Sequence, residues 1–147
     1  MSSMDNSQIA IINSLPEILF SNFCHSFFET ISFTKIGSIQ IMEDGIITGR
    51  GSIELGIVMS YHFVFLAKQQ MGIVPDTLIQ DLLNNMADET HKGIFVTTGQ
   101  FSRKTKKASK TKGLPPVDLI DGKGLIERLR ENNLELSIET GKVFFNG

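Results

Sequence analysis

The chain has 147 residues, of which 41% are hydrophobic and 20% charged, values typical of one globular domain and unlike those of disordered proteins. The net charge of −2 excludes a chain that is basic throughout. No apolar run is long enough to cross a bilayer, residues 1–8 carry no basic side chain of the kind that opens a secretory signal, and the single Cys24 has no disulfide partner, so we expect a cytoplasmic protein that does not enter membranes.

The first predicted element is a helix over residues 14–31. Ser14 and Glu17 fit a capping box, and Pro16 suits the first turn. Its apolar residues recur at the spacing of one buried face, and Cys24 lies among them as a small core residue. Strands are then predicted over residues 38–42, 53–59 and 62–68, the last two joined by a tight turn near Ser60–Tyr61.

The second half of the chain alternates helices and strands. The predicted elements are a helix over 76–89 with Asp76 as its cap, a strand over 93–97, an exposed helix after Ser102, a strand over 117–120, a helix around 125–129 and a hairpin over 135–145. This order predicts an α/β fold with a mixed central sheet flanked by helices on both faces. We expect a single domain over residues 1–147, with a core of about 14–132 and a C-terminal hairpin of about 134–146.

One short segment is strongly basic although the whole chain is not. Its six cations fall within ten positions without an acidic residue: Arg103, Lys104, Lys106, Lys107, Lys110 and Lys112. Such a cluster favours contact with phosphates over a merely solvated face. Thr97, Thr98 and Ser102 precede it at a strand end and helix start, where they could contact phosphate or simply cap the helix.

Glu54 and Lys68 are the residue pair that could carry chemistry. With a turn near Ser60–Tyr61, the hairpin would place them close to opposite each other. A lysine that ends an apolar strand favours a functional role over snorkelling to solvent, whereas a carboxylate and a lysine side by side are more often a surface pair.

Two segments carry a family resemblance. The stretch KGIFVTTGQFS over residues 92–102 and the stretch Val117–Gly122, together with the basic segment between them, resemble the C-terminal half of Mrr-type restriction endonuclease domains of the PD-(D/E)xK nuclease superfamily. The phenylalanines of the first helix fit the apolar positions of the family's opening helix, and the match covers roughly residues 16–130. The resemblance implies a restriction-endonuclease-like fold and DNA as the partner.

The resemblance also implies Mg²⁺- or Mn²⁺-dependent cleavage of DNA phosphodiesters, in defence against foreign DNA or in DNA processing. Glu54 stands where the family has a metal-binding Asp, and Lys68 where it has the catalytic lysine, with the Ala67 backbone carbonyl as a further metal ligand. Gln80 matches an accessory glutamine, and its other interpretation is a plain helix-surface residue. Specificity would come from a homodimer or a partner subunit.

The sequence departs from the family pattern at two positions. Leu66 stands where the family has Glu or Gln and cannot ligate a metal, and Ser21 stands where the first helix has a Glu. Compensating carboxylates could come from Glu17, Glu43 or Asp44. The alternative hypothesis is therefore a catalytically degenerate nuclease-fold subunit that binds DNA or a partner protein without cleaving. A third is an interaction domain with no DNA role.

Overall fold

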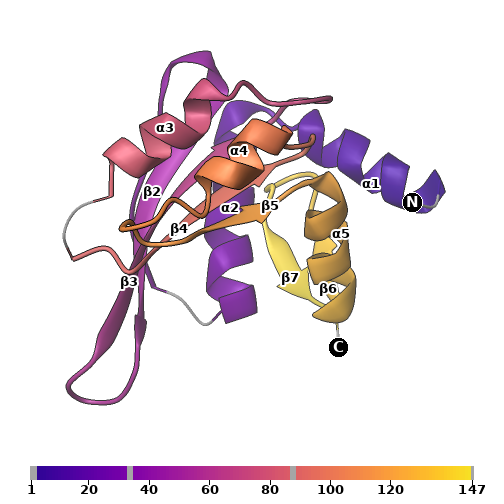
Figure 1. Cartoon of the computed structure of the whole chain (residues 1–147). Coiled ribbons are helices and arrows are strands. Elements are labelled where there is room, and N and C mark those ends of the chain that lie inside the picture. Colours follow the sequence, from indigo (N-terminus) through magenta and orange to yellow (C-terminus); the bar gives the residue numbers. More distant parts are fainter. Residues whose placement is uncertain (1–2, 33–34, 87–88, 147) are drawn as a thin grey trace.

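The computed structural model describes residues 3–32, 35–86 and 89–146. Its helices are α1 (Ser3–Asn13), α2 (Glu17–Ser32), the 3-10 turn η1 (Glu43–Gly45), α3 (Thr77–Asn84), α4 (Arg103–Ala108) and α5 (Gly122–Glu131). Its strands are β1 (Lys35–Ile41), β2 (Ile46–Glu54), β3 (Ser60–Lys68), β4 (Lys92–Thr97), β5 (Val117–Ile120), β6 (Leu134–Leu136) and β7 (Val143–Phe145). Figure 1 shows their arrangement.

A five-stranded sheet in the order β1-β2-β3-β4-β5 forms the centre of the fold. The first three strands pair antiparallel, and β3, β4 and β5 pair parallel to one another. Parallel neighbours need crossover connections, and those connections here contain α3 and α4. The predicted mixed sheet is confirmed, and its parallel strands all end at the same edge, beside Lys68 and Thr97.

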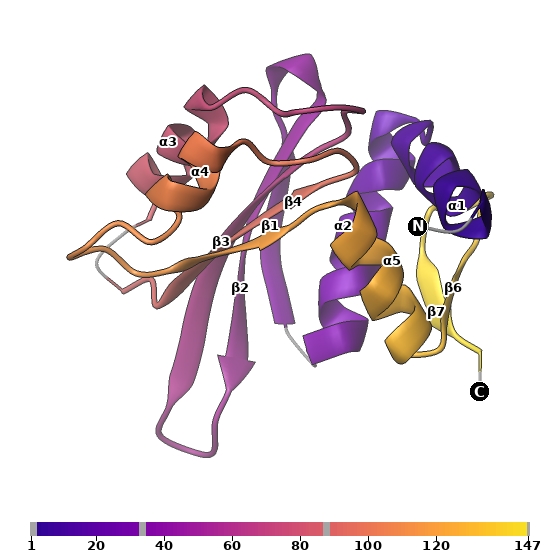
Figure 2. The same ribbon diagram turned by 45° about the vertical axis from the view of Figure 1, so that its right-hand side comes forward.

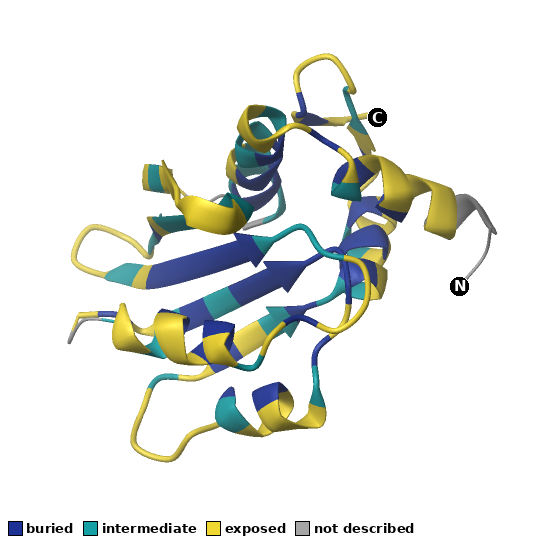
Figure 3. Ribbon diagram, turned by 90° about the horizontal axis from the view of Figure 1, so that it is seen from above, coloured by how far each residue is buried: buried dark blue, intermediate teal, exposed yellow. Residues whose placement is uncertain are grey.

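Helices cover both faces of the sheet (Figures 2 and 3), and an apolar core lies on each face. One core joins α1, α2 and α5 to the sheet, and its largest buried side chains are the phenylalanines of α2 with Phe63 and Phe65 of β3. The other core joins α3, the segment before α4 and Ala108 at the end of α4 to the opposite face through Leu66, Phe95 and Phe101. The expected helices on both faces are thus confirmed.

The N-terminal helix α1 was not predicted, because residues 1–8 are mostly polar. Ile9 and Ile12 are buried against the core and anchor it. The Ser14 hydroxyl donates to the Ala10 carbonyl at 2.7 Å, so it closes the end of α1. The predicted capping box at Ser14 is therefore wrong, and α2 begins at Glu17 directly after Pro16.

Strand β2 begins at Ile46, seven residues earlier than residue 53, and the turn of the hairpin is the loop 55–59 instead of Ser60–Tyr61. Within this strand, position 49 requires glycine because a side-chain carbon there would lie 2.4 Å from the Phe65 ring. The apolar residues of this loop had predicted a strand, but they are exposed to solvent: Ile57 is 102% exposed and Val58 is 91% exposed.

Helix α3 ends at Asn84, five residues before the predicted end at 89; of that stretch, residues 87–88 lie outside the described ranges. Asp76 precedes α3 without capping it through its side chain, and its carboxylate instead accepts a hydrogen bond from the Ser102 hydroxyl. The C-terminal hairpin is confirmed as β6 and β7, and the Val143 N–H donates to the Ser26 hydroxyl of α2 at 2.9 Å. Within the described ranges, no helix combines the length and apolar character needed to span a membrane.

Candidate functional site

The register of the β2–β3 hairpin separates the two residues expected to share a site. Glu54 lies opposite Ser60, and Lys68 lies opposite Ile46. Eight residues of extended strand divide these two rungs, which corresponds to roughly 26 Å. The Glu54 carboxylate accepts a hydrogen bond from the Ser60 hydroxyl at 3.2 Å, close to the hairpin loop. The predicted juxtaposition of Glu54 and Lys68 is wrong, because the strand was started too late and the turn was placed on the wrong residues.

Lys68 instead lies beside the turn that starts β2. Its ammonium donates a hydrogen bond to the carbonyl of Asp44 in η1. Glu17, the first residue of α2, approaches the same turn: a side-chain carbon at Gly45 would lie 3.4 Å from Glu17 Oε1. A lysine that bonds this three-residue turn and a carboxylate that lies near it thus come from distant parts of the sequence. All three acidic residues considered as substitutes for the missing ligands belong to this region, because Glu43 and Asp44 are part of η1 and Glu17 Oε1 lies near Gly45.

Leu66 provides no metal ligand at the position where the family pattern has Glu or Gln. It is 1% exposed and packs in the core beneath α3, directly opposite Thr48 across the hairpin. Ala67 lies in a strand paired on both sides, with Ile47 and with Val96, where backbone carbonyls are taken up by the sheet. The Leu66 side chain therefore offers no oxygen ligand, and the Ala67 carbonyl as a metal ligand stays a prediction.

The residues present do not form a complete site for Mg²⁺. No group of three or more His, Cys, Asp or Glu side chains is placed to hold a metal within the described part of the chain. Mg²⁺ requires hard oxygen ligands, and it is usually held by one or two carboxylates with waters and substrate phosphates. Glu43 and Asp44 belong to η1 and Glu17 lies near it, but no three acidic side chains among the described residues are placed around one position.

The threonine hydroxyls at the end of β4 make hydrogen bonds within the protein. Thr97 is 0% exposed, and its hydroxyl accepts the Gly99 N–H at 3.0 Å. Thr98 is 2% exposed and is bonded to Asn13 and Gln70. Their side chains stabilise the loop after β4 and do not face a solvent-borne phosphate.

Ser102 caps a helix and Gln80 lies on a helix surface, which are the structural alternatives to a role in the site. The Ser102 side chain accepts the Thr105 N–H at 3.0 Å as the N-cap of α4. Gln80 is exposed on α3 and does not approach Lys68 through any hydrogen bond described for it. Helix capping is the role that the structure supports for Ser102.

The basic segment lies on the surface as expected. Thr105 is 0% exposed and fixes α4 against the body of the protein. The cations around it are all exposed: Arg103, Lys104, Lys106, Lys107, Lys110 and Lys112. Between described residues the ion pairs are His25–Glu29 and Lys92–Asp118, so none of the six is neutralised by a neighbouring carboxylate there.

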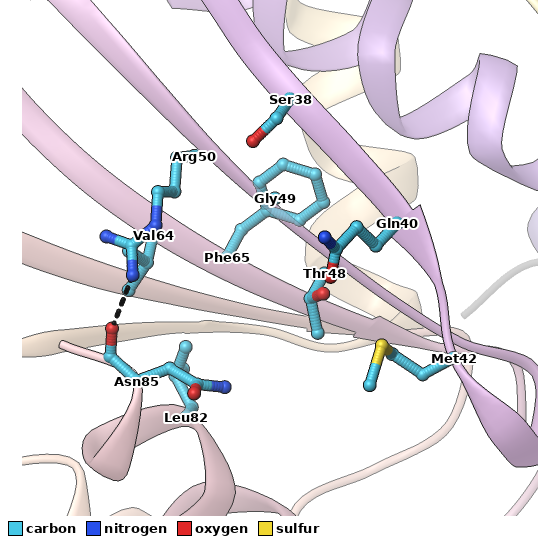
Figure 4. Close-up of a pocket in the computed structure, with 10 residues that line it drawn as sticks. All are labelled: Ser38, Gln40, Met42, Thr48, Gly49, Arg50, Val64, Phe65, Leu82 and Asn85. Carbon is cyan, nitrogen blue, oxygen red and sulfur yellow. Dashed lines mark hydrogen bonds between the residues drawn. The ribbon is translucent and has the colours of Figure 1, made fainter.

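A pocket that was not predicted from the sequence lies between α3 and the sheet (Figure 4). It has a volume of about 200 Å³ and is lined by side chains of β1, β2, β3 and α3. Arg50 reaches across it, and Nη2 donates to the Asn85 carbonyl at 3.0 Å. The signal was present in the sequence, because an arginine flanked by Gly49 and Gly51 in a strand indicates a polar group beside a close backbone approach.

Cys24 contributes no nucleophile. The thiol is 1% exposed within α2, and burial raises its pKa well above the ordinary value for cysteine. A thiol kept neutral in this way is inert, which agrees with the prediction of a small core residue.

The chain was compared with known proteins. A family model described as restriction endonuclease matches residues 12–129. The solved structure of the DNA modification-dependent restriction endonuclease AspBHI is similar in fold, with a TM-score of 0.59 and 16% sequence identity. The similarity covers 89% of this chain and 36% of that one. No curated protein matches the sequence.

Proposed function

Because this chain belongs to the restriction endonuclease family, we propose that it is a nuclease-fold subunit that binds duplex DNA through its basic segment, without a complete cleavage centre of its own. The observation that carries the proposal is the set of six exposed cations at and after α4, which no neighbouring carboxylate neutralises among the described residues. Cations in such a cluster replace the counterions of the DNA backbone, so binding is expected to weaken as salt rises.

The degenerate centre supports the second part of the proposal. Glu54 lies at the far end of the hairpin from Lys68, and Leu66 is buried in the core. The described residues offer no three-ligand cluster. Cleavage would then require carboxylates that another subunit, or a second copy of this chain, brings to the DNA.

Salt-dependent binding tests the role of the basic segment. Fluorescence anisotropy with a labelled duplex would be recorded between about 50 and 200 mM salt for the wild type and for a Lys106→Gln/Lys107→Gln variant. We expect the variant to bind more weakly and to lower the slope of log affinity against log salt by roughly one per lost phosphate contact. The matched control is Lys123→Gln/Lys142→Gln, which removes two exposed lysines from α5 and from the segment before β7.

Two results would overturn the proposal. One is a wild type that does not bind duplex DNA even at the lowest salt. The other is an equal loss of affinity in the two double variants, which would place the DNA elsewhere on the surface.

A second candidate function is metal-dependent cleavage of DNA, serving defence against foreign DNA or DNA processing. It is favoured by one observation: Lys68 bonds the Asp44 carbonyl of η1, and the Glu17 carboxylate lies near Gly45 of the same turn. A divalent ion held by Glu17 and by the phosphate of the substrate would supply the Lewis acid that such hydrolysis needs.

A plasmid-cleavage assay in Mg²⁺ and in Mn²⁺ decides between the candidates. If the chain cleaves, Lys68→Ala and Glu17→Gln should each abolish cleavage, while Glu127→Gln on α5 should not change it. Absence of cleavage by the wild type in either metal, alone or with partner subunits, would reject the second candidate and favour the first.

A further inference from the structure

The pocket beside Arg50 lies where α3 stops covering the sheet. Leu82 of α3 and Asn85, which directly follows that helix, form one wall, and β1 and β2 extend past them as the floor. Ser38 lies opposite Arg50, and Gln40 lies opposite Thr48, on two alternate rungs of the β1–β2 ladder. Side chains two residues apart on a strand point to the same face, so these polar groups converge on one space.

The charge of the pocket is positive. Its lining contains one cation, Arg50, and no acidic side chain: Ser38, Gln40, Met42, Thr48, Gly49, Arg50, Val64, Phe65, Leu82 and Asn85. The Arg50 side chain is exposed, and one of its five N–H donors is directed to the Asn85 carbonyl. That bond fixes the guanidinium at the pocket and leaves other donors for a ligand.

The neutral groups around Arg50 fit the oxygens of a ligand. The hydroxyls of Ser38 and Thr48 can each donate one hydrogen bond, and the amide of Gln40 can donate two. A planar guanidinium with further donors nearby matches the geometry of a phosphate, which it can hold through two parallel N–H bonds.

We propose that this pocket binds a phosphate group, carried by a nucleic acid strand or by a free nucleotide. The choice of phosphate over another anion rests on the proposed DNA-binding function. The pocket lies next to the contact of Lys68 with η1, because Met42 lines the pocket and directly precedes η1. It occupies the rungs of Thr48 and Arg50, whereas Lys68 lies opposite Ile46 at the end of the same ladder. A bound strand would then follow the open face of the sheet beside α3.

Titrations monitored by NMR test this inference on the full chain. The probes are inorganic phosphate, deoxyadenosine monophosphate and a short single-stranded oligonucleotide, with acetate as a carboxylate control. We expect saturable shifts of the backbone amides of Ser38, Gln40, Thr48 and Arg50. Phosphate or nucleotide acting alone identifies a free-ligand site, and a response to the oligonucleotide only identifies a backbone site. A response to acetate as strong as that to phosphate would overturn the phosphate assignment.

Variants of the pocket separate binding from folding. Arg50→Gln should weaken nucleotide or oligonucleotide binding at least about tenfold, because it removes a charge-assisted hydrogen bond. Thr48→Val removes a hydroxyl from the floor without touching the bond between Arg50 and Asn85, and it should weaken binding about threefold. Lys142→Gln, remote from the pocket, should bind like the wild type.

The inference fails if no probe shifts these amides, or if Arg50→Gln and Thr48→Val bind as the wild type does. Its failure can be distinguished from that of the proposed function. If Lys106→Gln/Lys107→Gln loses duplex binding and no probe shifts the pocket amides, the proposed function stands and the phosphate pocket is rejected. If the probes shift the pocket amides but the wild type does not bind duplex DNA, the phosphate pocket stands and the proposed function is rejected.

Discussion

The Lys68 ammonium donates a hydrogen bond to the backbone carbonyl of Asp44, which joins the end of β3 to the turn that starts β2. Asp44 adopts a left-handed conformation with φ of 60°, which is uncommon for a residue other than glycine. The lysine therefore supports a turn that the backbone alone does not favour. This gives Lys68 a structural role that is independent of any chemistry at the site.

Replacement of Lys68 should lower stability modestly. We expect Lys68→Met to reduce the free energy of unfolding by about 1–2 kcal/mol, because it removes one hydrogen bond from a charged donor. Urea unfolding measures the change, and Lys142→Met, on an exposed lysine, is the matched control. Equal stability of Lys68→Met and the wild type would show that the contact with Asp44 does not stabilise the turn.

Gly49 should not tolerate a side chain. A Cβ atom there would lie 2.4 Å from the Phe65 ring and 2.7 Å from the Ser38 carbonyl, inside the closest approach of real atoms. Gly49→Ala is expected to cost about 2–3 kcal/mol through overpacking. Gly56→Ala is the comparison: its φ of +84° strains an alanine, but nothing lies within 4 Å of the added carbon. Its expected cost is about 1 kcal/mol, and a cost equal to that of Gly49→Ala would contradict the packing argument.

Cys24 should be unreactive in the folded protein. It is 1% exposed, and burial raises the pKa of its thiol, so the thiolate that attacks disulfide reagents is scarce. We expect no reaction with Ellman's reagent under native conditions and one equivalent in denaturant. Rapid native labelling would mean that α2 opens readily from the sheet.

The ion pair between Lys92 and Asp118 joins β4 to β5 at 2.9 Å. Its hydrogen bond to Asp118 is the main reason that the pKa of Lys92 lies above the ordinary 10.5. A raised lysine pKa contributes stability that is fully present below pH 10.5 and is lost as pH rises through the higher folded value. Because both side chains are partly exposed, Asp118→Asn should cost less than about 1 kcal/mol at pH 9.

Thermal unfolding at several pH values checks this linkage. The difference between Asp118→Asn and the wild type should close as pH rises above the ordinary lysine value of 10.5. Glu127→Gln, which removes an exposed carboxylate from α5, should show no such trend. A difference for Asp118→Asn that persists unchanged at high pH would exclude Lys92 as its source.

The strands of the sheet could be predicted where apolar runs coincide with burial. The run Phe63–Leu66 is buried on both faces, and β3 was predicted to within two residues. The loop 55–59 carries the same kind of apolar residues without burying them, and no local pattern distinguishes that case. Glu54 was paired with the wrong residue because the turn was predicted at the wrong position, and an error in the turn changes every cross-strand partner in the hairpin.

The site could be predicted only in part for a related reason. Lys68 was identified from its place at the end of a buried strand, and the exposed basic segment from its charge. Glu17 and Arg50 depend on contacts with residues far away in the sequence, at Gly45 and at Asn85. Spacing along the chain carries no signal for such contacts, so the proximity of Glu17 to η1 emerged only from the three-dimensional arrangement, and the glycines that flank Arg50 indicated a close backbone approach without showing the pocket.

The order of the strands in the sheet has a consequence for how the chain folds. The antiparallel pairs of β1, β2 and β3 join neighbours in sequence, whereas the parallel pairs of β3 with β4 and of β4 with β5 close loops that contain α3 and α4. Closing a longer loop costs more chain entropy before its contacts form. We therefore expect the meander to form first and β4, the strand that leads towards the basic helix α4, to dock later. Until β4 docks, the edge of β3 would stay open to strands of other molecules, so we expect the folding chain to be most prone to aggregation at that stage.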